Sequence, residues 1–111
     1  MLSKPEVITA LAALAHPIRL DVFRALVEAG PAGATPTELG QVVQPQLKQS
    51  TLATHLKELT VAGLVVGERD GRAAIYRAAY DRMDGVIGFL TKNCCKGLPV
   101  REATEADSCG C

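Results

Sequence analysis

The stretch that decides the fold is QSTLATHLKELTVAGLVVGERDG, residues 49 to 71. Leu52, Leu56 and Leu59 are spaced by four and three residues, which places them on one face of a helix. The opposite face carries hydroxyl and amide groups and a lysine. Gly63 predicts the end of the helix, because glycine readily adopts the left-handed backbone conformation of a C-terminal cap. The first half of the stretch is therefore expected to form an amphipathic helix.

The second half of the stretch predicts a β-hairpin. Leu64 to Val66 is expected to form a short strand, Asp70-Gly71 a turn, and Ala73 to Ala78 the return strand. A polar-faced helix followed by a hairpin with a basic tip is typical of a winged helix-turn-helix. In that fold the helix enters a major groove and the hairpin contacts the adjacent backbone or minor groove. We therefore expect a mainly α fold with a small β-hairpin that binds DNA.

Three helices are expected before this stretch. The first is capped by Ser3 and ends at His16, the second spans residues 17 to 29, and the third is capped by Thr37. The turn at residues 44 to 46 then leads into the recognition helix. Two short helices joined by such a turn make up the helix-turn-helix.

A last helix is expected after the hairpin, with an N-cap at Asp81 and an end at Gly97-Leu98-Pro99. The first and last helices both have an apolar stripe wider than a lone surface helix of a small domain needs. We therefore expect these two helices to form the interface of a homodimer. The residues assigned to that interface are Val7, Leu11, Leu14, Val86, Ile87 and Leu90.

The length of 111 residues indicates one domain with a modest core, and the hydrophobic content of 48% is ordinary for a folded protein. No apolar stretch approaches the roughly 18 residues of a membrane span. No signal peptide is recognisable, so a cytoplasmic protein is expected. Residues 1–93 are expected to form the DNA-binding and dimerisation domain, and residues 94–111 a cysteine-containing tail.

The net charge is +0, but its distribution favours DNA binding at the recognition helix and hairpin. Residues 47 to 77 contain five cationic side chains against three acidic ones. The side chains expected to contact base edges are Gln49, Ser50, Thr51 and Thr54. Those expected to contact phosphates are Lys48, Lys57, Arg69 and Arg72, with Arg72 also a candidate for the minor groove. His55 is interpreted as a packing or phosphate-contacting residue.

The four cysteines are confined to the last eighteen residues, as Cys94, Cys95, Cys109 and Cys111. A secreted disulfide framework would distribute its cysteines through the fold. The observed pattern indicates a metal-binding or redox site added to a domain that folds without it. Lysines on both sides of the adjacent pair favour the thiolate form. Thiolates without histidine or carboxylate partners select soft ions.

The order of the elements and several short motifs resemble the ArsR/SmtB family of metal-responsive repressors. The similarity covers about residues 3 to 92. The motifs are His16-Pro17-Ile18-Arg19-Leu20, Thr54-His55-Leu56-Lys57-Glu58-Leu59, Ala62-Gly63-Leu64-Val65 and Gly71-Arg72 with Tyr76-Arg77. The resemblance implies a homodimeric winged helix-turn-helix repressor that binds its own promoter and is released when a metal or metalloid binds.

The chain departs from the family pattern at three places. Residues 39 to 43 contain no cysteine, where many members have a Cys-Val-Cys ligand pair. Residues 81 to 94 contain no histidine, where others have zinc ligands, and Ala53 stands where members often have serine. The pair Cys94-Cys95 remains, and it resembles the subset of arsenic repressors whose inducer site lies at the end of the dimerisation helix.

The inducer expected first is trivalent arsenic or antimony, which prefers three sulfur ligands. Cys94 and Cys95 would supply two of them, and Cys109 or Cys111 of either subunit the third. Two sulfurs alone would suit methylarsenite, and four would suit tetrahedral Zn²⁺ or Cd²⁺. Formation of a disulfide between the pair and a tail cysteine is a further alternative.

An enzyme is not expected. No cysteine follows a phosphate-binding glycine-rich loop, and no Cys-x-x-Cys motif begins a helix. No organic cofactor is expected either. The partners expected are operator DNA, a second copy of the chain and a small metalloid ligand.

Overall fold

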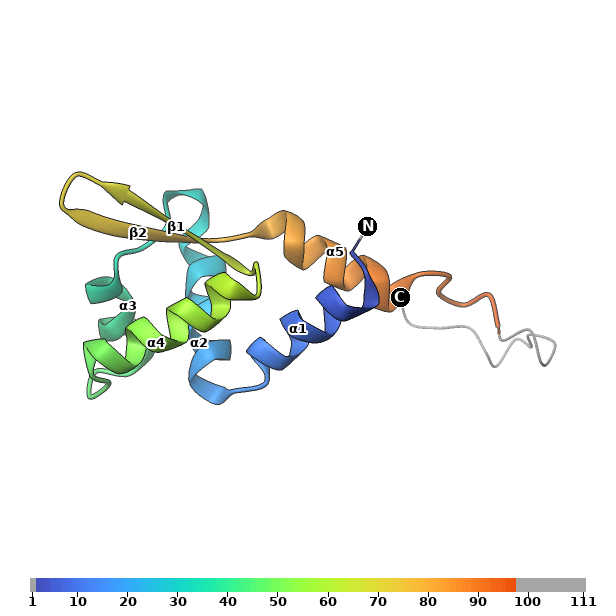
Figure 1. Cartoon of the computed structure of the whole chain (residues 1–111), viewed down its shortest axis with the longest axis horizontal. Helices are drawn as coiled ribbons and strands as arrows, with labels where there is room; N and C mark the ends of the chain where they lie inside the picture. The colour runs from blue at the N-terminus through green and yellow to red at the C-terminus, as the bar shows by residue number, and fades with distance from the viewer. Residues whose placement is uncertain (1, 98–111) are drawn as a thin grey trace.

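The computed structural model of the chain describes residues 2–97, with only the backbone described at Asp70. Five α-helices and one two-stranded sheet follow each other along the chain (Figure 1). Their bounds are α1 Lys4–Leu14, α2 Pro17–Ala29, the 3₁₀ helix η1 Gly30–Ala32, α3 Pro36–Val43, α4 Gln49–Val61, β1 Val65–Asp70, β2 Ala73–Ala78 and α5 Tyr80–Thr91. Among residues 2–97, no helix has the length and hydrophobicity to span a membrane.

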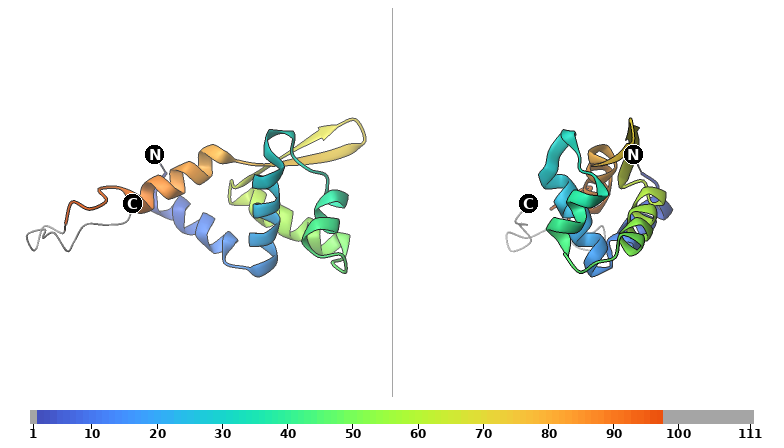
Figure 2. Two further views of the ribbon diagram at one scale, coloured as in Figure 1. Left: turned by 180° about the vertical axis from the view of Figure 1, so that it is seen from behind. Right: turned by 90° about the vertical axis from the view of Figure 1, so that its left-hand side faces the viewer.

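The predicted winged helix-turn-helix is confirmed. Helices α3 and α4 pack against each other and against α2, and the hairpin β1–β2 follows α4 directly. Both Figure 1 and the left view of Figure 2 show α1 and α5 side by side at one end of the domain, while the hairpin tip points toward the other end. The recognition helix α4 and helix α3 lie at the same end of the domain as the hairpin, and α4 contacts β1.

The core consists mainly of aliphatic side chains. The three leucines of α4 that define its apolar face, Leu52, Leu56 and Leu59, are all buried. They pack in one cluster with Phe23 and Leu26 of α2. Burying a side chain of this size contributes roughly 1.5–3 kcal/mol to folding. The spacing of apolar residues in α4 thus fixes which face of the recognition helix remains in solvent.

The helix caps agree with the prediction at α1 and differ at α3. Ser3 and Glu6 form the expected capping box at the start of α1. The cap of α3 is Thr35, whose hydroxyl accepts a hydrogen bond from the Glu38 backbone N–H, so the prediction of Thr37 is wrong. Thr35 precedes a proline, which is favoured at the first helical position, and Glu38 lies at the third position, where it completes the capping box.

The hairpin is longer than predicted. Strand β1 continues past Val66 to Asp70, in antiparallel register with β2 from Val65↔Ala78 to Asp70↔Ala73. The turn therefore consists of Gly71-Arg72, one residue later than expected, and Gly71 has the positive φ of 66° that such a turn needs. The charged run Glu68-Arg69-Asp70 at the end of β1 hid this extension, because exposed wing strands need no apolar residues.

Helix α5 begins and ends earlier than predicted. Its N-cap is Ala79, and Asp81 lies in the first turn, where a carboxylate favours the helix dipole without capping it. The helix ends at Thr91, well before Gly97, because Lys92 leaves the helical region with ψ of 130° and Asn93 has φ of 62°. The predicted stop residues Leu98 and Pro99 lie outside the described residues.

Candidate DNA interface and thiol site

The exposed face of α4 presents the short polar side chains that were expected to contact DNA. Ser50, Thr51, Thr54 and Lys57 are all exposed, as is Lys48 at the N-cap position. The Thr54 hydroxyl donates to the backbone carbonyl of Ser50 at 3.1 Å, which leaves its oxygen as an acceptor. The face can therefore offer hydroxyl donors and acceptors to base edges in a major groove.

Gln49 is held differently from these neighbours. Its Nε2 donates to the Pro36 backbone carbonyl at 3.4 Å. The same nitrogen would lie 2.8 Å from a Cβ added at Gly40, so the amide reaches across to α3. In this arrangement Gln49 connects the two helices of the helix-turn-helix, and its amide is directed toward α3.

The hairpin carries two exposed cations, Arg69 and Arg72. A third cation, Arg77, is fixed to the protein: Nη1 lies 2.8 Å from Glu68 Oε1, and Nε donates to the Pro31 carbonyl at 2.8 Å. Backbone hydrogen bonds of 2.9 Å in both directions between residues 34 and 76 further attach β2 to the α2–α3 loop. The wing is thus held in place while its two exposed arginines remain accessible to phosphates.

A groove of about 420 Å³ separates α4 from the hairpin. It is lined on one side by Lys57 and Thr60, and on the other by Arg69 and Tyr76. Tyr76 covers Gly67 so closely that a Cβ there would lie 2.8 Å from the ring. The Tyr76 ring therefore packs on the facing strand β1 and forms part of the hairpin wall of this groove.

His55 does not lie on the exposed face of α4. It is half-buried and packs on His16 at the α1–α2 junction, with ring centroids 4.6 Å apart. Burial lowers the pKa of His55, and the nearby His16 and Arg19 lower it further, while Glu58 opposes them. His16 Nδ1 accepts a hydrogen bond from the Ile18 N–H at 3.2 Å and thereby caps α2. The structure places His55 in a packing contact at the α1–α2 junction, and a phosphate contact by this side chain stays a prediction.

The apolar stripes of α1 and α5 are only partly covered. Leu11, Ile87 and Leu90 are 40%, 52% and 60% exposed, and Leu14 is half-buried. Ile8, which was not among the expected interface residues, is also exposed. The structure places the other two expected residues, Val7 and Val86, in the core of the protomer, at 2% exposure each. Their side chains point between the helices, so they do not belong to the exposed apolar face.

The adjacent cysteines lie in a tight turn just after α5. Their Sγ atoms are 3.0 Å apart. The turn is formed by hydrogen bonds from the Cys94 N–H to the Thr91 carbonyl and from the Lys96 N–H to the Asn93 carbonyl. Cys95, like Asn93, has a positive φ, which is uncommon for residues other than glycine. The backbone thus brings the two sulfur atoms close together.

Other predicted ligands cannot be placed. Cys109 and Cys111 lie outside the described residues, as does the rest of the tail from residue 98. Within residues 2–97, no group of three or more histidine, cysteine or acidic side chains is arranged to hold a metal ion.

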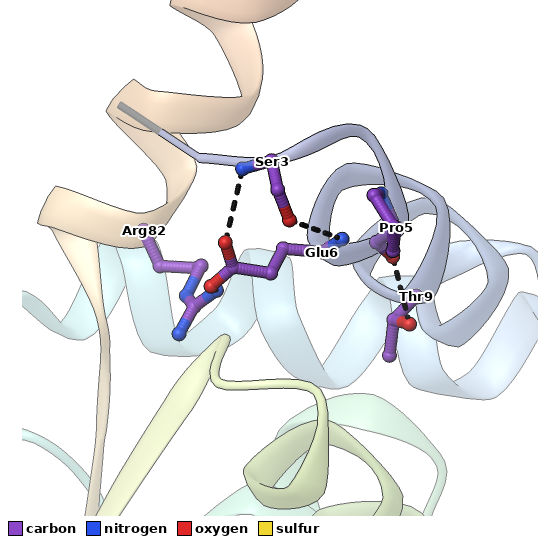
Figure 3. Close-up of polar contacts among 5 residues, drawn as sticks. All are labelled: Ser3, Pro5, Glu6, Thr9 and Arg82. Atoms are coloured by element: carbon purple, nitrogen blue, oxygen red, sulfur yellow. Dashed lines mark hydrogen bonds and ion pairs between the residues drawn. The ribbon is translucent and has the colours of Figure 1, made fainter.

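Sequence reasoning missed one polar junction. Arg82 of α5 lies 3.0 Å from Glu6 of α1 and covers Gly63 at the end of α4 (Figure 3). The two ion-paired residues are 76 positions apart, so no local pattern could indicate the contact.

Comparison with known proteins gives consistent results. A family model described as a helix-turn-helix domain matches residues 14–68. The chain is 39% identical over 77 residues to the HTH-type transcriptional repressor SmtB of Mycobacterium tuberculosis, a match that covers 69% of this chain and 53% of the relative. It thus spans about half the length of the curated relative it matches.

Solved structures show the same fold. An ArsR-like transcriptional regulator from Rhodococcus sp. RHA1 superposes with a TM-score of 0.67 at 25% identity, covering 79% of this chain and 78% of that chain. A structure described as a possible transcriptional regulator for arsenical resistance superposes with a TM-score of 0.63 at 26% identity, covering 73% and 79%.

Proposed function

The chain belongs to the ArsR/SmtB family of helix-turn-helix transcriptional regulators, and we propose that it is a dimeric repressor released from operator DNA by trivalent arsenic. In this proposal residues 1–93 bind DNA and dimerise, and residues 94–111 hold the inducer. The observation that carries the inducer assignment is the pair of sulfurs 3.0 Å apart at Cys94 and Cys95, next to the helix whose apolar face is exposed.

DNA binding is proposed to use the exposed face of α4 and the tip of the wing. Ser50, Thr51 and Thr54 present hydroxyl groups at the position from which a recognition helix reads base edges. Lys48, Lys57, Arg69 and Arg72 are the exposed cations around them. Their charge supplies the phosphate contacts that fix the orientation of the protein on the duplex.

Dimerisation is proposed to occur through the exposed apolar face of α1 and α5, defined by Ile8, Leu11, Ile87 and Leu90. All four side chains are at least 40% exposed in the protomer. An apolar patch of this kind on a small domain is typical of a protein–protein contact. A two-fold symmetric dimer would present two recognition helices to two half-sites of a palindromic operator.

Inducer binding is proposed at Cys94 and Cys95. In the reduced protein both sulfurs are soft ligands, and one ion can bridge two atoms 3.0 Å apart. Trivalent arsenic or antimony needs a third sulfur, which Cys109 or Cys111 of either subunit would donate. The name of one structural relative, a possible regulator for arsenical resistance, supports this choice of inducer.

The proposed mechanism is a shift in population between two arrangements of the dimer. Binding of the inducer at the end of α5 changes the angle between the subunits and misplaces the two recognition helices. To change DNA affinity about 100-fold, the inducer must disfavour the DNA-competent arrangement by about 3 kcal/mol.

The distance of 3.0 Å between the two sulfur atoms also favours a second candidate inducer. A monomethylated trivalent arsenical occupies one coordination position with its methyl group and needs only the two sulfurs at Cys94 and Cys95. Cadmium or zinc would instead use all four thiolates, and oxidation would join the pair to the tail by a disulfide.

A reporter gene placed behind the promoter of the chain's own gene would distinguish these signals. We expect arsenite to relieve repression in cells that carry the wild-type protein. The Cys94→Ser and Cys95→Ser variants are expected to repress without responding, and a Cys109→Ser/Cys111→Ser variant to lose its response to arsenite but keep one to methylarsenite. Relief by peroxide or cadmium alone would contradict the arsenic assignment.

A further inference from the structure

Three elements of the domain meet at the side chain of Arg82, on the first turn of α5. Arg82 Nη1 donates to Glu6 Oε2 of α1 at 3.0 Å. The same guanidinium lies against Gly63 at the end of the recognition helix, where an added Cβ would be 2.8 Å from Nε and 2.9 Å from Nη2. The side chain is only 30% exposed. It is therefore packed between α1, α4 and α5.

Glu6 is a fixed partner for this arginine. Its second carboxylate oxygen accepts a hydrogen bond from the Ser3 N–H at 2.9 Å, and its own N–H donates to the Ser3 hydroxyl at 3.3 Å (Figure 3). These bonds to Ser3, followed by the bond from Arg82, lower the pKa of Glu6. The carboxylate thus remains ionised, and its position is set by the first turn of α1.

A second contact joins the same turns of α1 and α5. Leu2 packs so closely on Gly85 that a Cβ there would lie 2.9 Å from its Cγ. Gly85 follows Arg82 by three residues and therefore lies on the same side of α5. The first turns of the two helices are thus joined by one polar and one apolar contact.

Gly63 is where the recognition helix ends and the wing begins. Its φ is +80°, and its N–H donates to the Thr60 carbonyl at 3.0 Å. The next residue, Leu64, accepts a hydrogen bond from the Ala79 N–H at 2.8 Å, directly before α5. A displacement of Arg82 therefore acts at the point that sets the direction of α4.

We propose that Arg82 is a positioning residue that couples α5 to the recognition helix through its contacts with Glu6 and Gly63. Because α5 is one uninterrupted helix, a displacement at Thr91 is carried over about 14 Å to Arg82. The inference rests on the proposed function, since it takes Cys94 and Cys95 as the place where the inducer acts. The ion pair is partly exposed and such pairs contribute little to stability, so we expect its loss to change the coupling more than the stability.

The test is a double-mutant cycle with Arg82→Gln, Glu6→Gln and the double variant. Glutamine at position 6 can still complete the capping box with Ser3, so this variant removes the ion pair and keeps the helix cap. Arg24→Gln is the matched control, because it breaks an exposed ion pair with Glu28 on α2. For each variant, affinity for a promoter fragment is measured with and without arsenite, and the ratio of the two affinities is compared.

We expect the ratio to fall about tenfold in each single variant, no further in the double variant, and not at all in the control. A merely structural role would lower thermal stability and leave the ratio unchanged, and that result would overturn the inference. Independent, additive effects of the two substitutions would also overturn it.

Failure of the proposed function has a different signature. It would appear in the wild-type protein, as DNA binding that does not respond to arsenite. In that case the rate of amide hydrogen exchange at residues 61 to 64, measured without inducer, tests whether Arg82 contacts the end of α4. Faster exchange in Arg82→Gln than in Arg24→Gln supports the coupling contact, and equal exchange overturns it.

Discussion

Substituting Gly63 by alanine tests how closely the end of the recognition helix is packed against α5. The substitution has two costs. An L-residue at φ of +80° costs roughly 1–2 kcal/mol, because Cβ approaches the following carbonyl. The new Cβ would also lie 2.8–2.9 Å from three atoms of Arg82, so the guanidinium must move away from its position beside Glu6. Forcing the Arg82 side chain away from its preferred rotamer costs about 0.5–1 kcal/mol.

Gly71 provides the matched control for the first of these costs. It has a similar φ of +66°, but a Cβ there would have no neighbour within 4 Å. We therefore expect Gly63→Ala to be less stable than Gly71→Ala by about 0.5–1 kcal/mol, which corresponds to roughly 2–8 °C in Tm for a domain of this size. Thermal unfolding followed by circular dichroism measures the difference, at one protomer concentration because dimerisation shifts Tm.

The contact itself is isolated by repeating the substitution in an Arg82→Ala background. With the guanidinium removed, Gly63→Ala is expected to cost no more than Gly71→Ala. If the cost of Gly63→Ala is the same with and without Arg82, the packing argument is refuted. The same result would remove the basis for coupling α5 to α4 through this position.

Three further predictions concern the histidine pair, the helix-turn-helix and the wing. Because burial lowers the pKa of His55, the folded protein binds fewer protons than the unfolded chain, whose histidine titrates near pH 6.5. The stability that neutral His55 contributes is therefore complete above about pH 6.5 and is lost as the pH falls through the lowered pKa of the folded protein. Urea unfolding at about pH 7.5 and about pH 5.5 measures how much unfolding free energy is lost between the two pH values. We expect His55→Gln to lose less than the wild type, and equal losses would contradict this. Gln49→Ala is expected to cost about 1 kcal/mol of stability and to weaken binding to all DNA sequences alike, whereas Thr51→Ala is expected to change the sequence preference. Binding to a randomised operator pool measures the preference. A changed preference in Gln49→Ala would contradict the assignment of Gln49 to α3–α4 packing. Arg72→Ala is expected to reduce the slope of log affinity against log salt by about 0.9 for each subunit, or about 1.8 for a dimer, and an unchanged slope would exclude a phosphate contact.

The secondary structure and the exposed polar face of α4 could be predicted largely because local patterns determine them. The leucine spacing in α4 fixes its buried face, so the exposed polar residues follow directly. Gly63 and Gly71 both have the positive φ expected of glycines at a helix end and a hairpin turn. These features depend on residues close together in the chain.

The structure adds most to the sequence analysis where the deciding contact is distant in the sequence. His55 was assigned on α4 alone, but its neighbour His16 comes from the α1–α2 junction. Val7 and Val86 belong to apolar stripes of α1 and α5 that contain both core residues and exposed residues. The sequence of one helix does not indicate which residues of its stripe a neighbouring helix covers. The Arg82–Glu6 pair depends on how α1 and α5 cross, for which the sequence contains no local signal.

The adjacent cysteines are an intermediate case. Their proximity along the chain was evident, but the turn that brings the two sulfurs within 3.0 Å depends on Asn93 and Cys95 adopting positive φ. Neither residue type demands that conformation. The pattern therefore predicts two sulfur ligands for a soft ion, and the structure describes how the two sulfur atoms are oriented.

The most direct test of the account is fluorescence anisotropy of the reduced protein on a labelled palindromic fragment of its own promoter, titrated with arsenite. We predict tight binding without arsenite and about 100-fold weaker binding with it. Cys94→Ser and Cys95→Ser are expected to bind DNA as well as the wild type and to remain bound when arsenite is added. Release that persists in both variants would contradict the proposed site. Failure of the wild type to bind the fragment would contradict the account as a whole.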